Sequence, residues 1–116
     1  LETNFNLEIT YIVEKLKTKI NDKKLVIWGM ASKGIIYSLH LIHNNIEPDY
    51  YIDININKQN KFIPLIGKLI INPNQLPKDK SLMIICMNPN YITEISEQCR
   101  SLKLDIELIS PNIVNY

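Results

Sequence analysis

Two short runs of the chain are apolar at every position, and they constrain the fold more than any other feature. Residues 25–28 read LVIW and end at Gly29, and residues 82–87 read LMIICM and stop at Asn88-Pro89-Asn90. A strand with one face in water alternates polar and apolar residues, whereas a strand without that alternation is buried on both faces. The two runs therefore predict strands of a parallel sheet that is covered on both sides.

The segments before, between and after these runs carry the helical spacing that such a cover requires. Apolar residues at positions 9, 12, 13, 16 and 20 predict an amphipathic helix from Asn6 onward, and those at 35, 36, 39 and 42 predict a second helix. A third helix is expected over 91–102, with strands at 50–54, 69–71 and 106–109 and one helical turn within 73–77. The alternation predicts a small Rossmann-like three-layer α/β domain with a mostly parallel sheet of about five strands, preceded by the N-terminal helix.

Length and charge exclude several classes of protein. The chain has 116 residues, enough for one domain with a real core, and its formal net charge of +1 gives no overall attraction to nucleic acid or to an anionic membrane. No apolar run reaches the ~18 residues that cross a bilayer, and the start lacks a signal-peptide pattern. We therefore expect a cytoplasmic protein with neither nucleic acid nor membrane as a partner. Cys86 and Cys99 lack the spacing of a zinc site, so we expect no metal.

The loop after the first apolar run resembles a phosphate-binding turn. The sequence GMASKG places Gly29 and Gly34 at the outer positions of the fingerprint Gly-x-Gly-x-x-Gly, with Ala31 in place of the middle glycine. The start of the following helix exposes backbone N–H groups that suit an anion, and Ser32 and Lys33 add a hydroxyl and a charge. The alternative, which the sequence supports equally well, is a purely structural turn that lets the strand and the helix pack together.

Two more loops are predicted at the same edge of the sheet, because the carboxyl ends of parallel strands meet there. Asp53 stands 24 residues beyond Gly29, near the spacing at which an acidic side chain binds a ribose. Asn55, two residues further on, is also a candidate ligand contact. The alternative is that Asp53 only caps the turn at Asn55. Lys58 and Lys61 follow in a basic loop, which is either a phosphate contact or an ordinary solvated segment. After the strand at 82–87, Asn88 and Tyr91 are candidate ligand contacts, with helix capping by Asn90 as the alternative.

Taken together, these segments resemble the C-terminal domain of the sugar C-methyltransferase family, whose members methylate a carbon of a nucleotide-linked deoxysugar. The resemblance covers nearly all of 24–111 and rests on W-G-x-x-x-K-G, then D-x-N-x-x-K-Q with a proline six residues after the lysine, then N-P-x-Y-x-x-E-I. The chain departs from the family at Leu65-Ile66, where a glycine and a threonine are usual. The resemblance implies a Rossmann-like domain that helps to hold the nucleotide sugar, while the catalytic groups belong to another domain.

These inferences together give one expected organisation. Residues 1–23 are expected to form a linker helix, and 24–116 the C-terminal domain of a longer protein, since the chain starts at Leu1 without a methionine. By the resemblance, S-adenosylmethionine and zinc belong to upstream domains, which are partners of this one, and the isolated domain binds no cofactor and is inactive. A homo-oligomer is left open. The alternatives are a noncatalytic assembly module and, less favoured because of Ala31, an NAD-binding domain. No nucleophile, base and orienting acid come together in the sequence, so we expect no catalytic residue.

Overall fold

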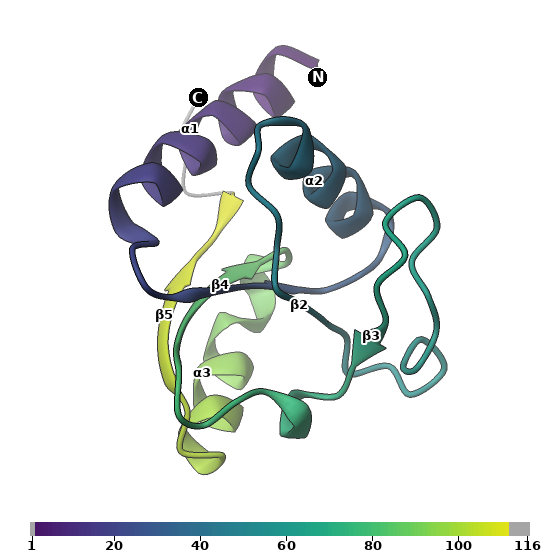
Figure 1. Cartoon of the computed structure of the whole chain (residues 1–116), viewed down its shortest axis with the longest axis vertical. Coiled ribbons are helices and arrows are strands. Elements are labelled where there is room, and N and C mark those ends of the chain that lie inside the picture. The colour runs from purple at the N-terminus through teal and green to yellow at the C-terminus, as the bar shows by residue number, and fades with distance from the viewer. Residues whose placement is uncertain (1, 112–116) are drawn as a thin grey trace.

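The structure, a computed structural model, describes residues 2–111, with side chains from residue 6 onward. Helices and strands alternate along the chain (Figure 1). The α-helices are α1 (Glu2–Lys19), α2 (Ser32–His43) and α3 (Ile92–Ser101), and there are two short 3₁₀ turns, η1 (Pro73–Gln75) and η2 (Pro89–Tyr91). The strands are β1 (Lys24–Trp28), β2 (Tyr50–Ile52), β3 (Ile70–Ile71), β4 (Ser81–Cys86) and β5 (Asp105–Ile109).

The five strands form one sheet in the order β3-β2-β1-β4-β5, and every pair is parallel. The two wholly apolar runs are the two central neighbours, β1 and β4, in register from Lys24 opposite Leu82 to Trp28 opposite Cys86. Central parallel strands have no face in water, which is why these two segments lack polar residues. The predicted Rossmann-like α/β fold is confirmed.

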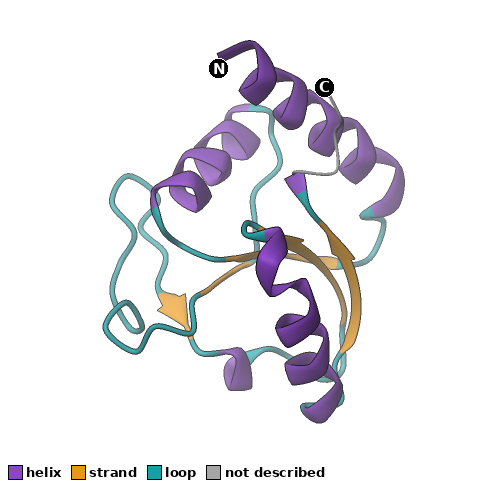
Figure 2. Ribbon diagram, turned by 180° about the vertical axis from the view of Figure 1, so that it is seen from behind, coloured by secondary structure: helices purple, strands orange, loops and turns teal. Residues whose placement is uncertain are grey.

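Alternate side chains of β1 enter two separate cores. Leu25 and Ile27 pack with residues of α1 and α2 on one face of the sheet, and Val26 and Trp28 pack with α3 on the other. Figure 2 shows α3 in front of and below the sheet, with α1 and α2 above it in this view. The predicted inward positions Ile95 and Cys99 of α3 are buried.

The first helix packs closely on the rest of the domain. It begins at Glu2, earlier than the expected Asn6, and its side chains Ile12 and Leu16 are fully buried in the same core as Ile27. Lys19 Nζ lies 3.2 Å from Glu107 Oε2 of β5. The division into a linker helix and a domain from residue 24 stays a prediction. Within residues 2–111 no helix is both long and apolar enough to span a membrane.

Candidate functional site

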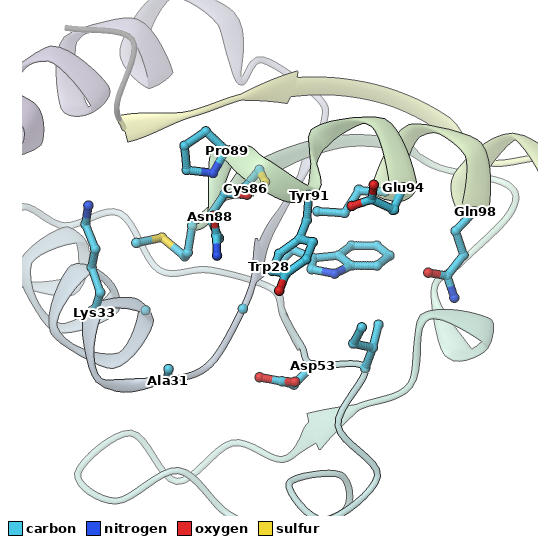
Figure 3. Close-up of a pocket in the computed structure, with 15 residues that line it drawn as sticks. Trp28, Ala31, Lys33, Asp53, Cys86, Asn88, Pro89, Tyr91, Glu94 and Gln98 are labelled. Carbon is cyan, nitrogen blue, oxygen red and sulfur yellow. Dashed lines mark hydrogen bonds between the residues drawn. The ribbon is translucent and has the colours of Figure 1, made fainter.

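A cleft of about 730 Å³ opens at the carboxyl edge of the sheet, between the loops that follow β1 and β4 (Figure 3). These strands are neighbours, but the chain proceeds from β1 toward β2 and from β4 toward β5, in opposite directions across the sheet. The loops therefore diverge, and this is where open α/β sheets bind ligands. The lining residues are Trp28, Gly29, Ala31, Lys33, Gly34, Asp53, Ile54, Cys86, Met87, Asn88, Pro89, Tyr91, Glu94, Ile95 and Gln98.

The two glycines of the first loop have structural reasons to be glycine. Gly29 has φ +111°, a conformation that side chains disfavour, and its N–H donates to the Ile52 carbonyl at 2.8 Å. A Cβ on Gly34 would lie 2.0 Å from the Gly29 carbonyl oxygen, so the first turn of α2 packs directly on the loop backbone. The turn interpretation of this glycine pattern is thus sufficient to explain both glycines, and a ligand role must rest on other residues.

The N-terminus of α2 opens onto the cleft, and its first turn contains no Asp or Glu, although Glu8 Oε2 of α1 lies 3.8 Å from the Lys33 ammonium. Ala31 is the N-cap residue and supplies no side-chain hydrogen bond, and both Ala31 and Lys33 line the cleft. The first N–H groups of an α-helix have no acceptor within the helix and carry the positive end of its dipole. The arrangement suits an anionic group, with the Ala31 methyl at the wall.

Asp53 joins the first loop to the second. Its Oδ2 accepts the Met30 N–H at 2.9 Å, and its Oδ1 accepts the Asn55 N–H at 2.9 Å. Lys58 Nζ lies 3.9 Å from the same Oδ2 and donates to the Met30 carbonyl at 3.4 Å. The alternative role of Asp53 as a turn cap is therefore observed. A carboxylate has about four acceptor positions, so these bonds leave capacity for a ligand hydroxyl.

The third loop is capped differently from the expectation. Asn88, rather than Asn90, is the capping residue, because its Oδ1 accepts the Asn90 N–H at 3.0 Å at the start of η2. Tyr91, at the end of η2, is 54% exposed and borders the cleft, while Trp28 below it is almost fully buried. The Cys86 thiol donates to the Asn88 carbonyl, and burial raises the pKa of this thiol, so that Cys86 is a packing residue.

The structure brings together seven of the eleven residues proposed from the sequence. The residues that line the cleft are Gly29, Ala31, Lys33, Gly34, Asp53, Asn88 and Tyr91. Four do not line it. Ser32 is an exposed residue of the first turn of α2, Asn55 is held in the turn after Asp53, and Lys58 contacts Asp53 without reaching the wall. Lys61 lies farther along the chain, between β2 and β3, next to an antiparallel bridge that joins Phe62 to Leu69.

Sequence reasoning missed the wall on the α3 side. Glu94, Ile95 and Gln98 follow Tyr91 at intervals of three and four, the spacing that places residues on one helical face, so extension of the pattern from Tyr91 would have found them. Trp28 and Cys86 were taken only as strand residues. Their positions at the ends of β1 and β4 also place them at the cleft floor.

The walls combine apolar surface with a few polar groups. Trp28, Met87 and Ile54 contribute apolar atoms, while Asp53, Asn88 and Gln98 contribute acceptors and donors (Figure 3). In the described residues no group of three or more His, Cys, Asp or Glu side chains is placed to hold a metal ion. Such a cleft is equipped to bind and orient a polar ligand of moderate size.

Comparisons with known proteins support the fold and leave the family open. No family model matches the sequence, and no curated protein is found as a relative. Three chains of solved structures match. One is UDP-D-quinovosamine 4-dehydrogenase from Vibrio fischeri, which is 21% identical, with a TM-score of 0.55 over 76% of this chain and 78% of that chain. At this identity the likeness shows a shared Rossmann-like fold, and membership of the sugar C-methyltransferase family stays a prediction.

Proposed function

We propose that the cleft binds a nucleotide-linked sugar and that this chain is the substrate-holding C-terminal domain of an S-adenosylmethionine-dependent sugar C-methyltransferase. One observation carries the binding proposal: the N-terminus of α2, the Asp53 carboxylate and the aromatic residues Trp28 and Tyr91 converge in a single cleft at the switch point between β1 and β4. This combination offers an anion site, a hydroxyl acceptor and a flat apolar surface within one cavity.

Each part of the ligand has a matching group. The phosphates lie at the backbone N–H groups of the first turn of α2, while the Lys33 ammonium at the rim is paired with Glu8 Oε2 at 3.8 Å. Asp53 accepts hydroxyl hydrogens, from the ribose or from the sugar, on its remaining acceptor positions. Tyr91 packs its exposed ring against the base or the sugar face. Asn88 and Gln98 add hydrogen-bonding groups on the α3 side.

Two further facts support this ligand class. The cavity of about 730 Å³ lies in the range of roughly 300 to 1,000 Å³ typical of small-molecule sites. The structurally similar Vibrio fischeri protein is by name a UDP-sugar enzyme, although its likeness to this chain is limited to the fold. The motifs quoted above add the methyltransferase context, in which the methyl donor and the catalytic groups belong to other domains. The domain alone is then inactive.

A dinucleotide is the weaker candidate for the same cleft. In the fingerprint the middle glycine lets the backbone approach the pyrophosphate closely. Here that position is Ala31, whose methyl group borders the cleft. NAD should therefore bind no better than the nucleotide sugar.

An NMR titration of backbone amides tests the proposal. Thymidine-diphosphate and uridine-diphosphate sugars should shift amides of 29–34, Asp53 and Asn88, with a Kd on the order of 0.1 to 1 mM because a missing neighbouring domain supplies the remaining contacts. Tyr91→Ala should weaken binding about fivefold through the lost ring contact. Phe62→Ala is the matched control, since Phe62 is also exposed, at 69%, but lies outside the cleft.

Three outcomes would count against the proposal. Equal loss from Tyr91→Ala and Phe62→Ala would place the ligand outside the cleft. Shifts at the glycine loop with NAD alone would favour the dinucleotide function. An absence of shifts with every ligand would favour the noncatalytic assembly module.

A further inference from the structure

The segment that follows Asp53, beyond β2, carries positive charges only. Residues 54–78 include Lys58, Lys61, Lys68 and Lys78 and no aspartate or glutamate, although the whole chain has a net charge of only +1. Of these, Lys58 is engaged with Asp53, while Lys61 and Lys68 are exposed. A local excess of one sign selects partners of the other sign, and the average over the chain conceals it.

Lys61 and Lys68 flank a well-formed hairpin, which we call the basic hairpin (60–70). Its strands are joined by an antiparallel bridge between Phe62 and Leu69 and by hydrogen bonds from the Ile63 N–H to the Lys68 carbonyl at 2.8 Å and from the Ile70 N–H to the Lys61 carbonyl at 3.0 Å. Ile63 is 1% exposed and anchors the hairpin in the core. In Figure 1 the chain between β2 and β3 projects from the edge of the sheet. The hairpin is thus a fixed protrusion.

Leu65, at the tip of the basic hairpin, is an unfavourable residue for the backbone conformation and the exposure of its position. Its backbone is left-handed, with φ 69°, and its side chain is 91% exposed. Among the described residues, three of the four other non-glycine positions with positive φ are asparagines, the side chain that tolerates this conformation. Both the backbone and the solvent favour asparagine or glycine over leucine here. Folding therefore does not account for a leucine at this position.

The tip is apolar beyond this one residue. Phe62 is 69% exposed and Leu69 40% exposed, and their pairing across the bridge places them on one face of the hairpin. Pro64 is also exposed. The basic hairpin thus presents an apolar end with an ammonium group on each strand beside it.

We propose that the basic hairpin docks on an anionic lipid surface, with Leu65 and Phe62 entering the acyl boundary and Lys61 and Lys68 at the headgroups. A bilayer with acidic lipids offers both an apolar interior and a negative surface to one small protrusion. A second copy of this chain fits less well, because symmetric contact of two such hairpins would oppose lysine to lysine. Nucleic acid would attract the lysines but gives no reason for an exposed Leu65. The association is peripheral, and it departs from the expectation based on net charge.

Vesicle flotation tests the proposal on the full chain. The protein should float with vesicles of equal parts phosphatidylglycerol and phosphatidylcholine, and much less with phosphatidylcholine alone. Binding should fall when NaCl rises from about 0.1 M to about 1 M, as the Debye length shortens from about 10 to about 3 Å. Leu65→Asn should reduce partitioning about tenfold through loss of the inserted side chain, and Lys61→Gln with Lys68→Gln should remove the salt dependence.

Controls separate docking from folding. Leu7→Asn changes another exposed leucine, 49% exposed on α1, and should leave partitioning unchanged. Leu65→Asn should melt no lower than the parent, because asparagine suits the left-handed backbone. The proposal is overturned if Leu65→Asn binds the anionic vesicles as well as the parent, if neutral vesicles bind equally, or if the parent stays unbound. A concentration-dependent dimer that Leu65→Asn abolishes would assign the hairpin to a second copy instead.

Discussion

Tyr51 shows how a single buried atom can set the alkaline limit of stability. The residue is 1% exposed in β2, and in the described part of the chain its hydroxyl has no hydrogen-bond partner. Burial, followed by the charges of Glu47 and Asp49, raises the pKa of Tyr51 from 10.0 to about 12. The folded protein then holds the Tyr51 proton more tightly than the unfolded chain does. The stabilisation that comes from this difference is complete below pH 10 and is lost as the pH rises from about 10 to about 12.

Tyr51→Phe should therefore leave stability unchanged at neutral pH, or raise it by up to about 1 kcal/mol, and should reduce the loss between about pH 10 and 12. Tyr37→Phe is the matched comparison, because Tyr37 is also fully buried but donates its hydroxyl to Glu8 Oε2 at 2.9 Å. That change should cost about 1 to 2 kcal/mol. Urea denaturation at neutral and alkaline pH measures both. Equal losses from the two variants would mean that the Tyr51 hydroxyl is satisfied in solution.

Turn residues of the site were predictable because their chemistry is local. Gly29 and Gly34 follow an apolar strand and precede a helix, and Asp53 ends the next strand, so their common edge follows from the parallel fold. Lys61 was not predictable in this way. It belongs to the basic hairpin, whose direction depends on the burial of Ile63 and on pairing between Phe62 and Leu69, and no fixed spacing from β2 reveals that.

At the scale of elements, α1 is the segment whose expected role as a linker can be tested most directly. Leu16 and Leu7 lie on this one helix, the first fully buried against the sheet and the second 49% exposed. Leu16→Ala should lower the free energy of unfolding by about 3 kcal/mol, because it leaves a cavity in the core that α1 shares with β1 and β4. Leu7→Ala should change it by less than about 0.5 kcal/mol. Chemical denaturation of both variants measures the difference. It is followed by the fluorescence of Trp28, which lies in the sheet, rather than by helix content.

If α1 were only a linker, both leucine variants would unfold at the parent's denaturant concentration. Equal midpoints would thus support a domain that begins at residue 24, whereas the expected gap would make α1 part of the folding unit.

Strand positions were predicted within one residue for four of the five strands, and β2 is the exception. The runs at 25–28 and 82–87 match β1 and β4 within one residue, since full burial leaves no polar position. The expected strand at 50–54 ends at Ile52 instead, because Asp53 turns the chain by bonding the Met30 and Asn55 N–H groups. β3 has only two residues, too few for any periodicity.

At the scale of the molecule, the cleft joins loops that lie far apart in the sequence. The loop walls that follow β1, β2 and β4 were predictable from the switch-point rule. The α3 wall was not recognised, because Ile95 and Cys99 were interpreted only as core positions and the helical spacing was not extended from Tyr91 to Glu94 and Gln98.

The whole domain should bind no methyl donor, because its one glycine-rich loop already belongs to the proposed nucleotide-sugar cleft. Calorimetric titration with S-adenosylmethionine should give no saturable heat. The same protein sample titrated with the nucleotide sugar serves as the control for its integrity. Submillimolar S-adenosylmethionine binding that Tyr91→Ala weakens would assign the cleft to the donor instead of the sugar.

The contact between Gly34 and Gly29 affects how related sequences should be compared. The space that a Cβ on Gly34 would need is filled by the chain's own carbonyl oxygen at 2.0 Å, with no ligand involved. Selection for folding alone is then enough to keep this glycine through evolution, even in descendants that have lost or exchanged their ligand. An invariant glycine pair would thus record shared ancestry of the fold. Changes of ligand would instead appear as substitutions at Ala31, Tyr91 and Gln98, which border the cleft without such a constraint.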